Sequence, residues 1–390
     1  MPAWTIPLSD LDYGEDEIDA VARVLRTKWI SMGPEVESFE GEFAALHGAK
    51  YAVAVSSATA GLHLSFLVAE IGTGDEIIQP ALNFVATANM TVACGATPVF
   101  ADITSLAEPT IDPEEVERLI TPRTRAVVAM HYGGNLCRMN ELLGLCRKRH
   151  ILLIEDACHA VGVPYHDALG RPPDGTMAGS IGDLGTFSFF ANKNMAMGEG
   201  GMIVTPHEDF AAKARLLRSH GMTSMTWDRH RGHANAYGVI SHGYNYRLDE
   251  LHGTLGRVQL RKLSHNNLRR RQLLYSYKNA IDQLDRWTMP FNEVIENSAG
   301  HLMVTLAPTM EARDRASNWL RQAGIQSSMH YPCIADFSAF AQWRSQPLPI
   351  TREFVQKALT LPLYPTMAET DVHRVCSQIA MSSRMSATSI

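Results

Sequence analysis

Short apolar runs alternate with longer stretches of helical periodicity between residues 51 and 205. The runs at 125–132 and 151–157 are almost continuously apolar, which is typical of strands covered on both faces of a sheet. Strands that alternate with helices in this way form mostly parallel sheets, so we predict an α/β fold. The predicted strands are 51–56, 75–80, 97–103, 125–132, 151–157, 185–190 and 202–205, with helices over 58–70, 83–95, 113–120 and 139–150.

A different pattern follows residue 205. It predicts a helix over 209–220, a polar, His-rich loop over 221–243, and a long helix over 248–284 with a basic, solvated face. Beyond Pro290, a strand over 301–308 and helices over 311–324 and 370–381 indicate a smaller α+β unit. We therefore divide the chain into a large domain, residues 1–250, and a small C-terminal domain, residues 251–390. The long helix opens the small domain, and residues 1–15 are expected to pack on it.

Composition narrows the class of protein. The 390 residues are 45% hydrophobic and 19% charged, which excludes a disordered chain. A net charge of −6 without a long basic run argues against binding to nucleic acid or to a membrane surface. The charge-free stretch 77–101 is interrupted by proline, glycine and amide residues, so we interpret it as buried core rather than a membrane span.

The six cysteines form no Cys-x-x-Cys pair and no cluster, which argues against a zinc site or a disulfide framework. The histidines at 220, 230, 233 and 242 lack the spacing of a metal site, so no metal is expected. The N-terminus lacks the basic and apolar segments of a signal peptide. A cytoplasmic protein is the expectation.

Two acids end an apolar strand in the segment 151–157. Glu155 and Asp156 lie at the carboxyl edge of the predicted sheet, where α/β proteins bind ligands. His159 follows three residues after Asp156 and would lie on the same side of a helical turn. Taken alone, the segment fits a helix cap with a satisfied histidine as well as it fits a functional site.

Lys193 is the one charged residue between Asp183 and Glu199. A lysine in such surroundings has a lowered pKa, and only the neutral amine attacks a carbonyl carbon. Aromatic residues before it and the Gly-rich turn 198–201 after it make an ordinary solvated loop lysine a weaker explanation. The segment therefore suggests imine chemistry.

A third weak signal follows the first strand, where small residues open a helix at Ala58 and Thr59. The free N–H groups at a helix start can hold a phosphate, although capping alone also explains such residues. Motifs for ATP and NAD binding are absent. A ring-binding acid, an imine-forming lysine and a phosphate-binding helix start are together what pyridoxal 5'-phosphate requires, so we predict this cofactor.

Seven segments resemble the DegT/DnrJ/EryC1/StrS sugar aminotransferases in sequence and in order. They are SSATAGLHLSF (56–66), ALNFVATANMTVACGATPVFADI (81–103), AMHYGGN (129–135), IEDACHAVG (154–162), GDLGTFSFFANKNMAMGEGGMIVT (182–205), LRSHG (217–221) and NYRLDEL (245–251). The resemblance covers nearly the whole chain. It implies a fold-type I enzyme, similar in architecture to aspartate aminotransferase, which moves an amino group from L-glutamate onto a nucleotide-linked keto sugar.

The resemblance also implies a role for individual residues. Lys193 would be the catalytic base that holds the cofactor, and Asp156 would bind the pyridine nitrogen. The other implied cofactor contacts are Phe84, stacked on the ring, His159, near the ring and its O3', and Ala58, Thr59 and Ser188, on the phosphate. Asn245 would reach the phosphate of the other subunit, which implies a homodimer with shared active sites.

Ala58 stands where the family commonly has glycine, a change expected to preserve the backbone N–H.

Two alternatives to an aminotransferase stay open. A sugar dehydratase that uses pyridoxamine phosphate is one alternative, but those enzymes have His where this chain has Lys193. A cofactor-bound sensor or scaffold without turnover is the other, since fold does not fix function. We predict transfer to a 4-keto-6-deoxy sugar nucleotide, while the nucleotide, the aminated carbon and the pathway stay open.

Overall fold

A seven-stranded sheet forms the centre of the computed structural model, which describes residues 4–166, 175–224, 236–343 and 347–384. Its strands are β1 (Tyr51–Val55), β2 (Glu76–Pro80), β3 (Thr97–Ala101), β4 (Thr124–Met130), β5 (Leu152–Asp156), β6 (Leu184–Ser188) and β7 (Gly201–Thr205). Their order across the sheet is β1-β7-β6-β5-β4-β2-β3. Because β7 is antiparallel to both β1 and β6 while the other pairs are parallel, the predicted mostly parallel sheet is confirmed.

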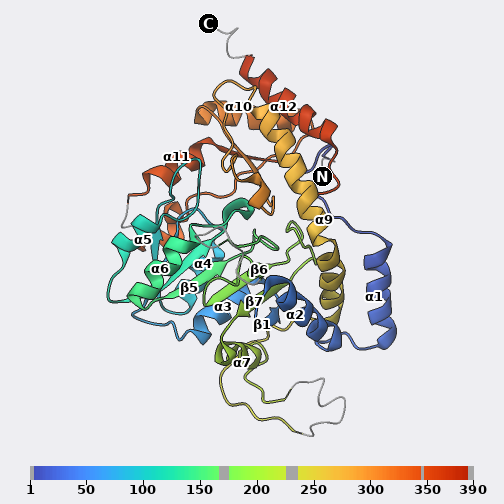
Figure 1. The fold of residues 1–390 in the computed structure, drawn as a ribbon, viewed down its shortest axis with the longest axis vertical. Coiled ribbons are helices and arrows are strands. Elements are labelled where there is room, and N and C mark those ends of the chain that lie inside the picture. The colour runs from blue at the N-terminus through green and yellow to red at the C-terminus, as the bar shows by residue number, and fades with distance from the viewer. Residues whose placement is uncertain (1–3, 167–174, 225–235, 344–346, 385–390) are drawn as a thin grey trace.

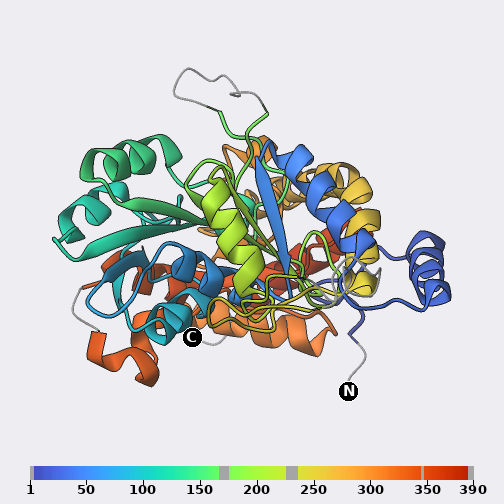
Figure 2. The same cartoon turned by 90° about the horizontal axis from the view of Figure 1, so that it is seen from below.

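Helices cover both faces of this sheet (Figure 2). Side chains of a strand alternate between faces, so Val53 and Val55 pack against one set of helices and Ala52 and Ala54 against the other. The first set is α3 (Ala58–Val68), α4 (Ala86–Ala93) and α7 (Glu208–Leu217). The second is α2 (Pro34–His47), α5 (Pro113–Leu119), α6 (Met139–Arg149) and the first half of α9 (Glu250–Ile281).

A second apolar core lies around the other half of α9. It is built on the antiparallel pair β8 (Met303–Leu306) and β9 (Ala358–Leu361). Helices α10 (Met310–Gln322) and α12 (Glu369–Arg384) pack there with Leu273 and Tyr277 of α9, and Figure 1 shows α11 (Pro349–Lys357) beside them. Since α9 contributes to both cores, the division of the chain near residue 250 stays a prediction.

The N-terminal segment joins the second core and then packs along α9. Ile6 is buried in the second core, and its backbone pairs with Gly324 and Gln326. Helix α1 (Glu15–Thr27) then lies against α9 at the edge of the molecule in Figure 1. Helices α1, α2 and α11 and strand β9 were not predicted from the sequence.

The solvated basic face predicted for the long helix is partly wrong. Arg270 is 3% exposed and donates to the backbone carbonyls of Gly300 and Leu363, at 3.3 and 3.0 Å. Arg257 pairs instead with Glu35 and Glu42 of α2. Because α9 passes between two packed units, side chains on several of its faces meet protein rather than water.

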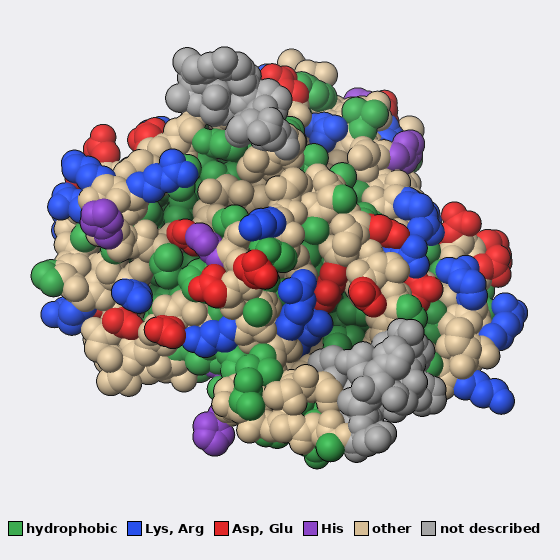
Figure 3. Space-filling view, turned by 60° about the horizontal axis from the view of Figure 1, so that its bottom comes forward, with side chains coloured by type: hydrophobic (Ala, Val, Ile, Leu, Met, Phe, Trp, Pro, Cys, Tyr) green, Lys and Arg blue, Asp and Glu red, His purple; other side chains and the backbone are tan. Residues whose placement is uncertain are grey.

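Surface charge is mixed on the described part of the face in Figure 3, where Lys and Arg side chains alternate with Asp and Glu. Within the described ranges, none of the helices has the length and apolarity that crossing a membrane requires. The predicted His-rich loop lies partly outside those ranges, and His230 and His233 with it.

Candidate active site

A cavity of about 350 Å³ lies at the edge of the sheet where the parallel strands end. Each strand there is followed by a turn whose side chains line the cavity, as expected at the carboxyl edge of an α/β sheet. The lining residues are Ser57, Ala58, Thr59, Leu62, Asn83, Phe84, Ala86, Met130, Asp156, Cys158, His159, Ser188, Phe190, Asn192, Lys193, Glu199, His330 and Tyr331. The structure therefore brings together every site residue predicted from the sequence except Asn245.

Lys193 reaches this cavity from the turn between β6 and β7. Its backbone N–H donates to Phe190 O at 2.9 Å, which holds the turn closed. Burial lowers the pKa of the Lys193 amine, while the nearby Cys158 and Asp156 oppose the shift. A larger fraction of this amine is therefore neutral, and able to attack a carbonyl, than for a solvated lysine.

Asp156 is the last residue of β5 and is 5% exposed. Its Oδ2 accepts hydrogen bonds from Asn83 Nδ2 and Thr87 Oγ1, both at 3.3 Å, and its Oδ1 accepts one from the Cys158 N–H. These donors hold the Asp156 carboxylate in place at the wall of the cavity. Such a carboxylate fits the task of holding a proton on a pyridine nitrogen.

The start of α3 forms another wall. Ser57 caps the helix, since its Oγ accepts the Ala60 N–H at 3.1 Å. Ala58 and Thr59 occupy the first two helical positions, whose N–H groups have no partner within a helix. The positive end of the helix and the Ser188 hydroxyl across the cavity fit a bound phosphate.

Gly201 permits this close approach. A Cβ at this position would lie 2.5 Å from the Ser57 carbonyl carbon and 2.7 Å from the Ala58 nitrogen. The last glycine of the GEGG segment therefore allows β7 to lie directly beside the start of α3.

Phe84 and His159 complete the predicted contacts. The Phe84 side chain is 54% exposed in the described chain and meets the Tyr331 ring at a tilt, with 5.8 Å between ring centroids. His159 is 2% exposed and lies between the Gly133 N–H and the Tyr331 hydroxyl. An exposed aromatic face at a cavity wall fits the stacking of a planar ring.

Asn245 lies outside the cavity. Its side chain is exposed, and its backbone forms an antiparallel bridge with Ser219. The structure of one chain thus leaves the predicted contact from a second subunit as a proposal.

Several residues in or beside the cavity were not assigned from the sequence. Asn83, in the turn after β2, and Thr87, in the first turn of α4, donate to Asp156, and Tyr331 reaches His159 from far along the chain. The polar residues around Phe84, directly after a strand, were a usable signal for the first two. Tyr331 offered no comparable signal, because its partner His159 lies 172 positions earlier in the chain.

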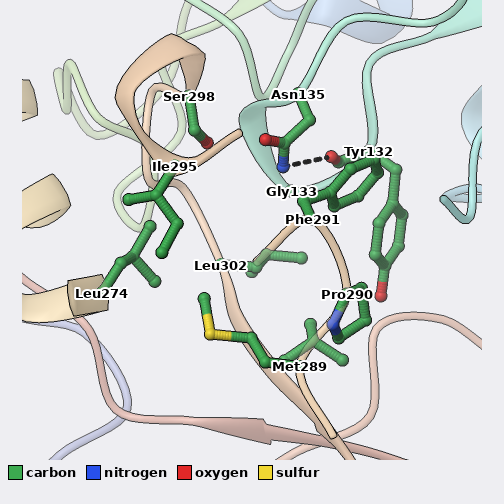
Figure 4. A pocket seen from close by; sticks show the side chains of 11 residues that line it. Tyr132, Gly133, Asn135, Leu274, Met289, Pro290, Phe291, Ile295, Ser298 and Leu302 are labelled. Atoms are coloured by element: carbon green, nitrogen blue, oxygen red, sulfur yellow. Dashed lines mark hydrogen bonds between the residues drawn. The ribbon is translucent and has the colours of Figure 1, made fainter. Parts of the chain in front are cut away.

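Two other cavities among the described residues lack this combination of groups. A groove of about 570 Å³ near Arg138 and Phe291 has no lysine in its lining. Figure 4 shows a cavity of about 20 Å³, mostly apolar, in which Asn135 Nδ2 donates to Tyr132 O at 3.3 Å. No group of three metal-ligating side chains occurs in the part of the chain that the structure describes.

The fold and the site define an α/β aminotransferase. The chain belongs to the DegT/DnrJ/EryC1/StrS aminotransferase family, whose model matches residues 11–380. The spore coat polysaccharide biosynthesis protein SpsC of Bacillus subtilis is 37% identical over 96% of this chain and 95% of its own length. The predicted family and fold class are confirmed.

Solved structures agree with this assignment. The aminotransferase TlmJ of Streptoalloteichus hindustanus matches with a TM-score of 0.88 and 29% identity, over 98% of this chain and 99% of that one. A protein of Streptococcus pneumoniae described as a sugar aminotransferase is 26% identical, and its PLP form matches with a TM-score of 0.88 over 97% of this chain and 99% of that one. It was also solved in a PMP form. Family membership and these forms imply pyridoxal phosphate as the cofactor.

Proposed function

We propose that this aminotransferase moves the amino group of L-glutamate onto a nucleotide-linked 4-keto-6-deoxy sugar, giving an amino-sugar nucleotide. The observation that carries the proposal is the shared cavity of Lys193 and Asp156, with the start of α3 as a third wall. The relatives named above as sugar aminotransferase and polysaccharide biosynthesis protein support a sugar acceptor.

Pyridoxal phosphate, when bound, supplies an electron sink that makes the carbon bearing the amino group acidic. Lys193 would hold the cofactor through its amine until the amine of the donor displaces it, and the freed Nζ would then take the proton from that carbon of the donor. In the second half of the cycle, Lys193 gives a proton back to the sugar carbon that receives the amino group. Asp156 keeps the proton on the pyridine nitrogen throughout.

The remaining predicted residues orient the cofactor. Ala58 and Thr59 bind its phosphate through the backbone N–H groups of the α3 start, and Ser188 through its hydroxyl. Phe84 would stack on one face of the pyridine ring, and His159 would lie near the ring and its O3' oxygen. We further propose a homodimer in which Asn245 of each subunit reaches the phosphate in the other.

A cytoplasmic location is part of the proposal. All six cysteines are free thiols, and four of them are buried. Free thiols are typical of proteins kept in a reducing compartment.

The visible absorption spectrum tests the proposal. The protein mixed with pyridoxal phosphate is expected to show a visible band that L-glutamate bleaches. Lys193→Ala is expected to lack the band and to lose multiple turnover, while Lys148→Ala, a change at an exposed lysine on α6, keeps both. A Lys193→Ala variant with full turnover would refute the assignment. A band that glutamate leaves unchanged would refute the amino donor.

A panel of keto-sugar nucleotides then tests the acceptor. Product analysis after a single incubation with glutamate is expected to show an amino-sugar nucleotide. A deoxygenated sugar product would instead indicate a dehydratase.

A further inference from the structure

The hydrogen bonds around His159 define which of its nitrogens carries the proton. The Gly133 N–H donates to Nδ1 at 3.4 Å, so Nδ1 must present its lone pair. In a neutral imidazole the proton then resides on Nε2, which lies 3.0 Å from the Tyr331 hydroxyl oxygen. Burial lowers the pKa of His159 well below 6.5, and the charge of Lys193 adds to the shift, so the ring is neutral. His159 therefore donates its one N–H proton to Tyr331.

The His159 ring is fixed in this orientation from behind. It lies against His301, with 4.1 Å between ring centroids, and His301 Nδ1 lies 3.0 Å from Asn194 Oδ1. Asn194 Nδ2 in turn donates to Asn267 Oδ1 of α9 and to Ala299 O, both at 2.8 Å. A flip of the His159 ring would break the bonds at both of its nitrogens, so its proton is not available to the cavity.

The hydroxyl hydrogen of Tyr331 is not used in the bond with His159. Its hydroxyl oxygen accepts from His159, so its own O–H can point only to another acceptor. Burial raises the pKa of Tyr331 well above 10, which keeps the hydroxyl protonated. Tyr331 lines the cavity with Lys193 and lies against Phe84. It thus offers the cavity a hydrogen-bond donor of defined direction.

His330, the residue before Tyr331, is held through both its backbone and its side chain. Tyr132, whose carbonyl is bound by Asn135 in Figure 4, donates its hydroxyl to His330 O. His330 Nδ1 lies 3.1 Å from Thr360 Oγ1 of β9. The Tyr331 hydroxyl is therefore positioned before any ligand binds.

We propose that the Tyr331 hydroxyl, rather than the His159 imidazole, donates the hydrogen bond to the phenolic oxygen O3' on the ring of the bound cofactor. His159 is then the residue that positions Tyr331. This inference rests on the proposed function. The ring oxygen of pyridoxal phosphate is attached to the carbon next to the one that bears the aldehyde, so it lies near the lysine that holds the cofactor. It is anionic, and an anionic oxygen is the acceptor that a pre-aligned hydroxyl stabilises most.

The test is a pH titration of the visible band of the cofactor-loaded protein without substrate. The titratable groups that line the cavity or lie near Tyr331 are Asp156, Cys158, His159, Lys193, Glu199, His301, His330 and Tyr132. Burial lowers the pKa of His330 to about 4, lowers those of His159 and His301 well below 6.5, and raises that of Cys158 well above 9. A midpoint between pH 6 and pH 9 therefore reports the cofactor bound to Lys193.

Tyr331→Phe is expected to raise this midpoint by about one to two pH units, because an anionic oxygen without its donor is more basic. His159→Ala should raise it in the same direction. His159→Gln should restore it, since an amide can accept from Gly133 and donate to Tyr331 at once. The double variant His159→Ala/Tyr331→Phe should shift the midpoint no further than Tyr331→Phe alone.

Tyr275→Phe is the matched control, since the exposed Tyr275 on α9 donates its hydroxyl to Glu296 and does not line the cavity, and it should leave the midpoint unchanged. A midpoint that moves in His159→Ala but not in Tyr331→Phe would overturn the inference and return the donor role to His159. The absence of any visible band in the unchanged protein would overturn the proposed function itself.

Discussion

At the scale of single residues, His47 shows what burial does to an ionisable group. It is fully buried at the end of α2, stacked on Phe43 with 4.1 Å between ring centroids. The Gly162 N–H donates to its Nε2 at 3.2 Å, so its Nδ1 carries the proton and donates to Phe43 O. Burial lowers the pKa of His47 from 6.5 to about 4, although the Phe43 carbonyl opposes the shift.

The lowered pKa makes stability depend on pH. Between pH 6.5 and pH 4 the unfolded chain binds a proton at His47 that the folded chain does not, so stability falls as the pH falls through this window. From pH 7 to pH 5 this one group accounts for a loss of about 2 kcal/mol in the free energy of unfolding. His47→Gln keeps both hydrogen bonds without titrating. Between pH 7 and pH 5 its free energy of unfolding should therefore fall by about 2 kcal/mol less than that of the unchanged protein. Urea unfolding at the two pH values measures the difference.

The matched control is His373→Gln on the exposed side of α12, which should keep the pH dependence of the unchanged protein. Equal losses in His47→Gln and in the unchanged protein would contradict the assignment of the shift to His47.

Glu155 and Asp156 show how far single residues could be predicted from the sequence. Both acids were visible at the end of an apolar strand, and alternation along a strand places them on opposite faces. Asp156 faces the cavity, whereas Glu155 accepts the backbone N–H groups of Gly179, Ile181 and Gly182, each at 2.7 Å. Without the family resemblance, only the arrangement of the loop at 179–182 shows which acid is structural, because the sequence of that loop gives no sign of its bonds to Glu155.

At the scale of elements, the contact between α2 and α9 depends on glycines inside α9. A Cβ on Gly256 would lie 2.8 Å from Phe39 Cζ and 2.9 Å from Met197 Sδ. Phe39 is itself fixed between Phe43 and Phe189, with ring centroids 5.9 and 5.4 Å away. Gly256 therefore lowers the intrinsic stability of the helix but allows α9 to pack closely against α2.

We predict that packing outweighs propensity. Gly256→Ala should lower the free energy of unfolding by about 1–3 kcal/mol, as for overpacked cores. Gly144→Ala in α6, where a Cβ meets nothing within 4 Å, should raise it by about 0.5–1 kcal/mol through helix propensity alone. Denaturant unfolding of the two variants measures both effects. A stabilised Gly256→Ala would show that α2 moves away at little cost.

The elements missed from the sequence have two different causes. The buried residues of α2 include Val36, Phe39 and Phe43, at helical spacing, so a signal was present and was not used. β9 has four residues, and its partner β8 lies more than 50 positions earlier. A strand that short is defined by its pairing rather than by its own pattern.

At the scale of the whole molecule, the site depends on the contact between two groups of elements: those around the seven-stranded sheet and those that follow α9. Asp102, after β3, accepts the N–H groups of Ile350 and Thr351 at the start of α11, at 3.0 and 2.7 Å. Tyr331 meets His159 across a separation of 172 positions. The cofactor residues Lys193, Asp156 and Ser188 each stand in a local motif and could be predicted. The contribution of Tyr331 could not, because it arises only when both groups are in place.

In the proposed homodimer, Asn245 belongs to the active site of the other subunit. It lies in a recognisable motif, yet it is exposed and apart from the cavity that holds Lys193. In the proposed homodimer each active site uses Lys193 from one subunit and Asn245 from the other. Asn245→Ala should therefore weaken pyridoxal phosphate binding at least tenfold, an expected loss of about 1.4 kcal/mol for one phosphate contact. Equilibrium dialysis of the cofactor measures it.

Mixing two defective variants tests the exchange directly. Lys193→Ala and Asn245→Ala dimers, unfolded together and refolded at equal concentration, should form half mixed dimers, each with one intact site. Activity at limiting cofactor should then recover to about a quarter of the unchanged protein, because a closed two-fold dimer shares its residues reciprocally. Lys193→Ala mixed with Lys148→Ala serves as the control. Because Lys148 lies outside the site, the activity of this mixture should follow only from the number of subunits that keep Lys193. If the mixture of Lys193→Ala and Asn245→Ala is no more active than its two components, Asn245 acts within its own chain and the shared site is wrong.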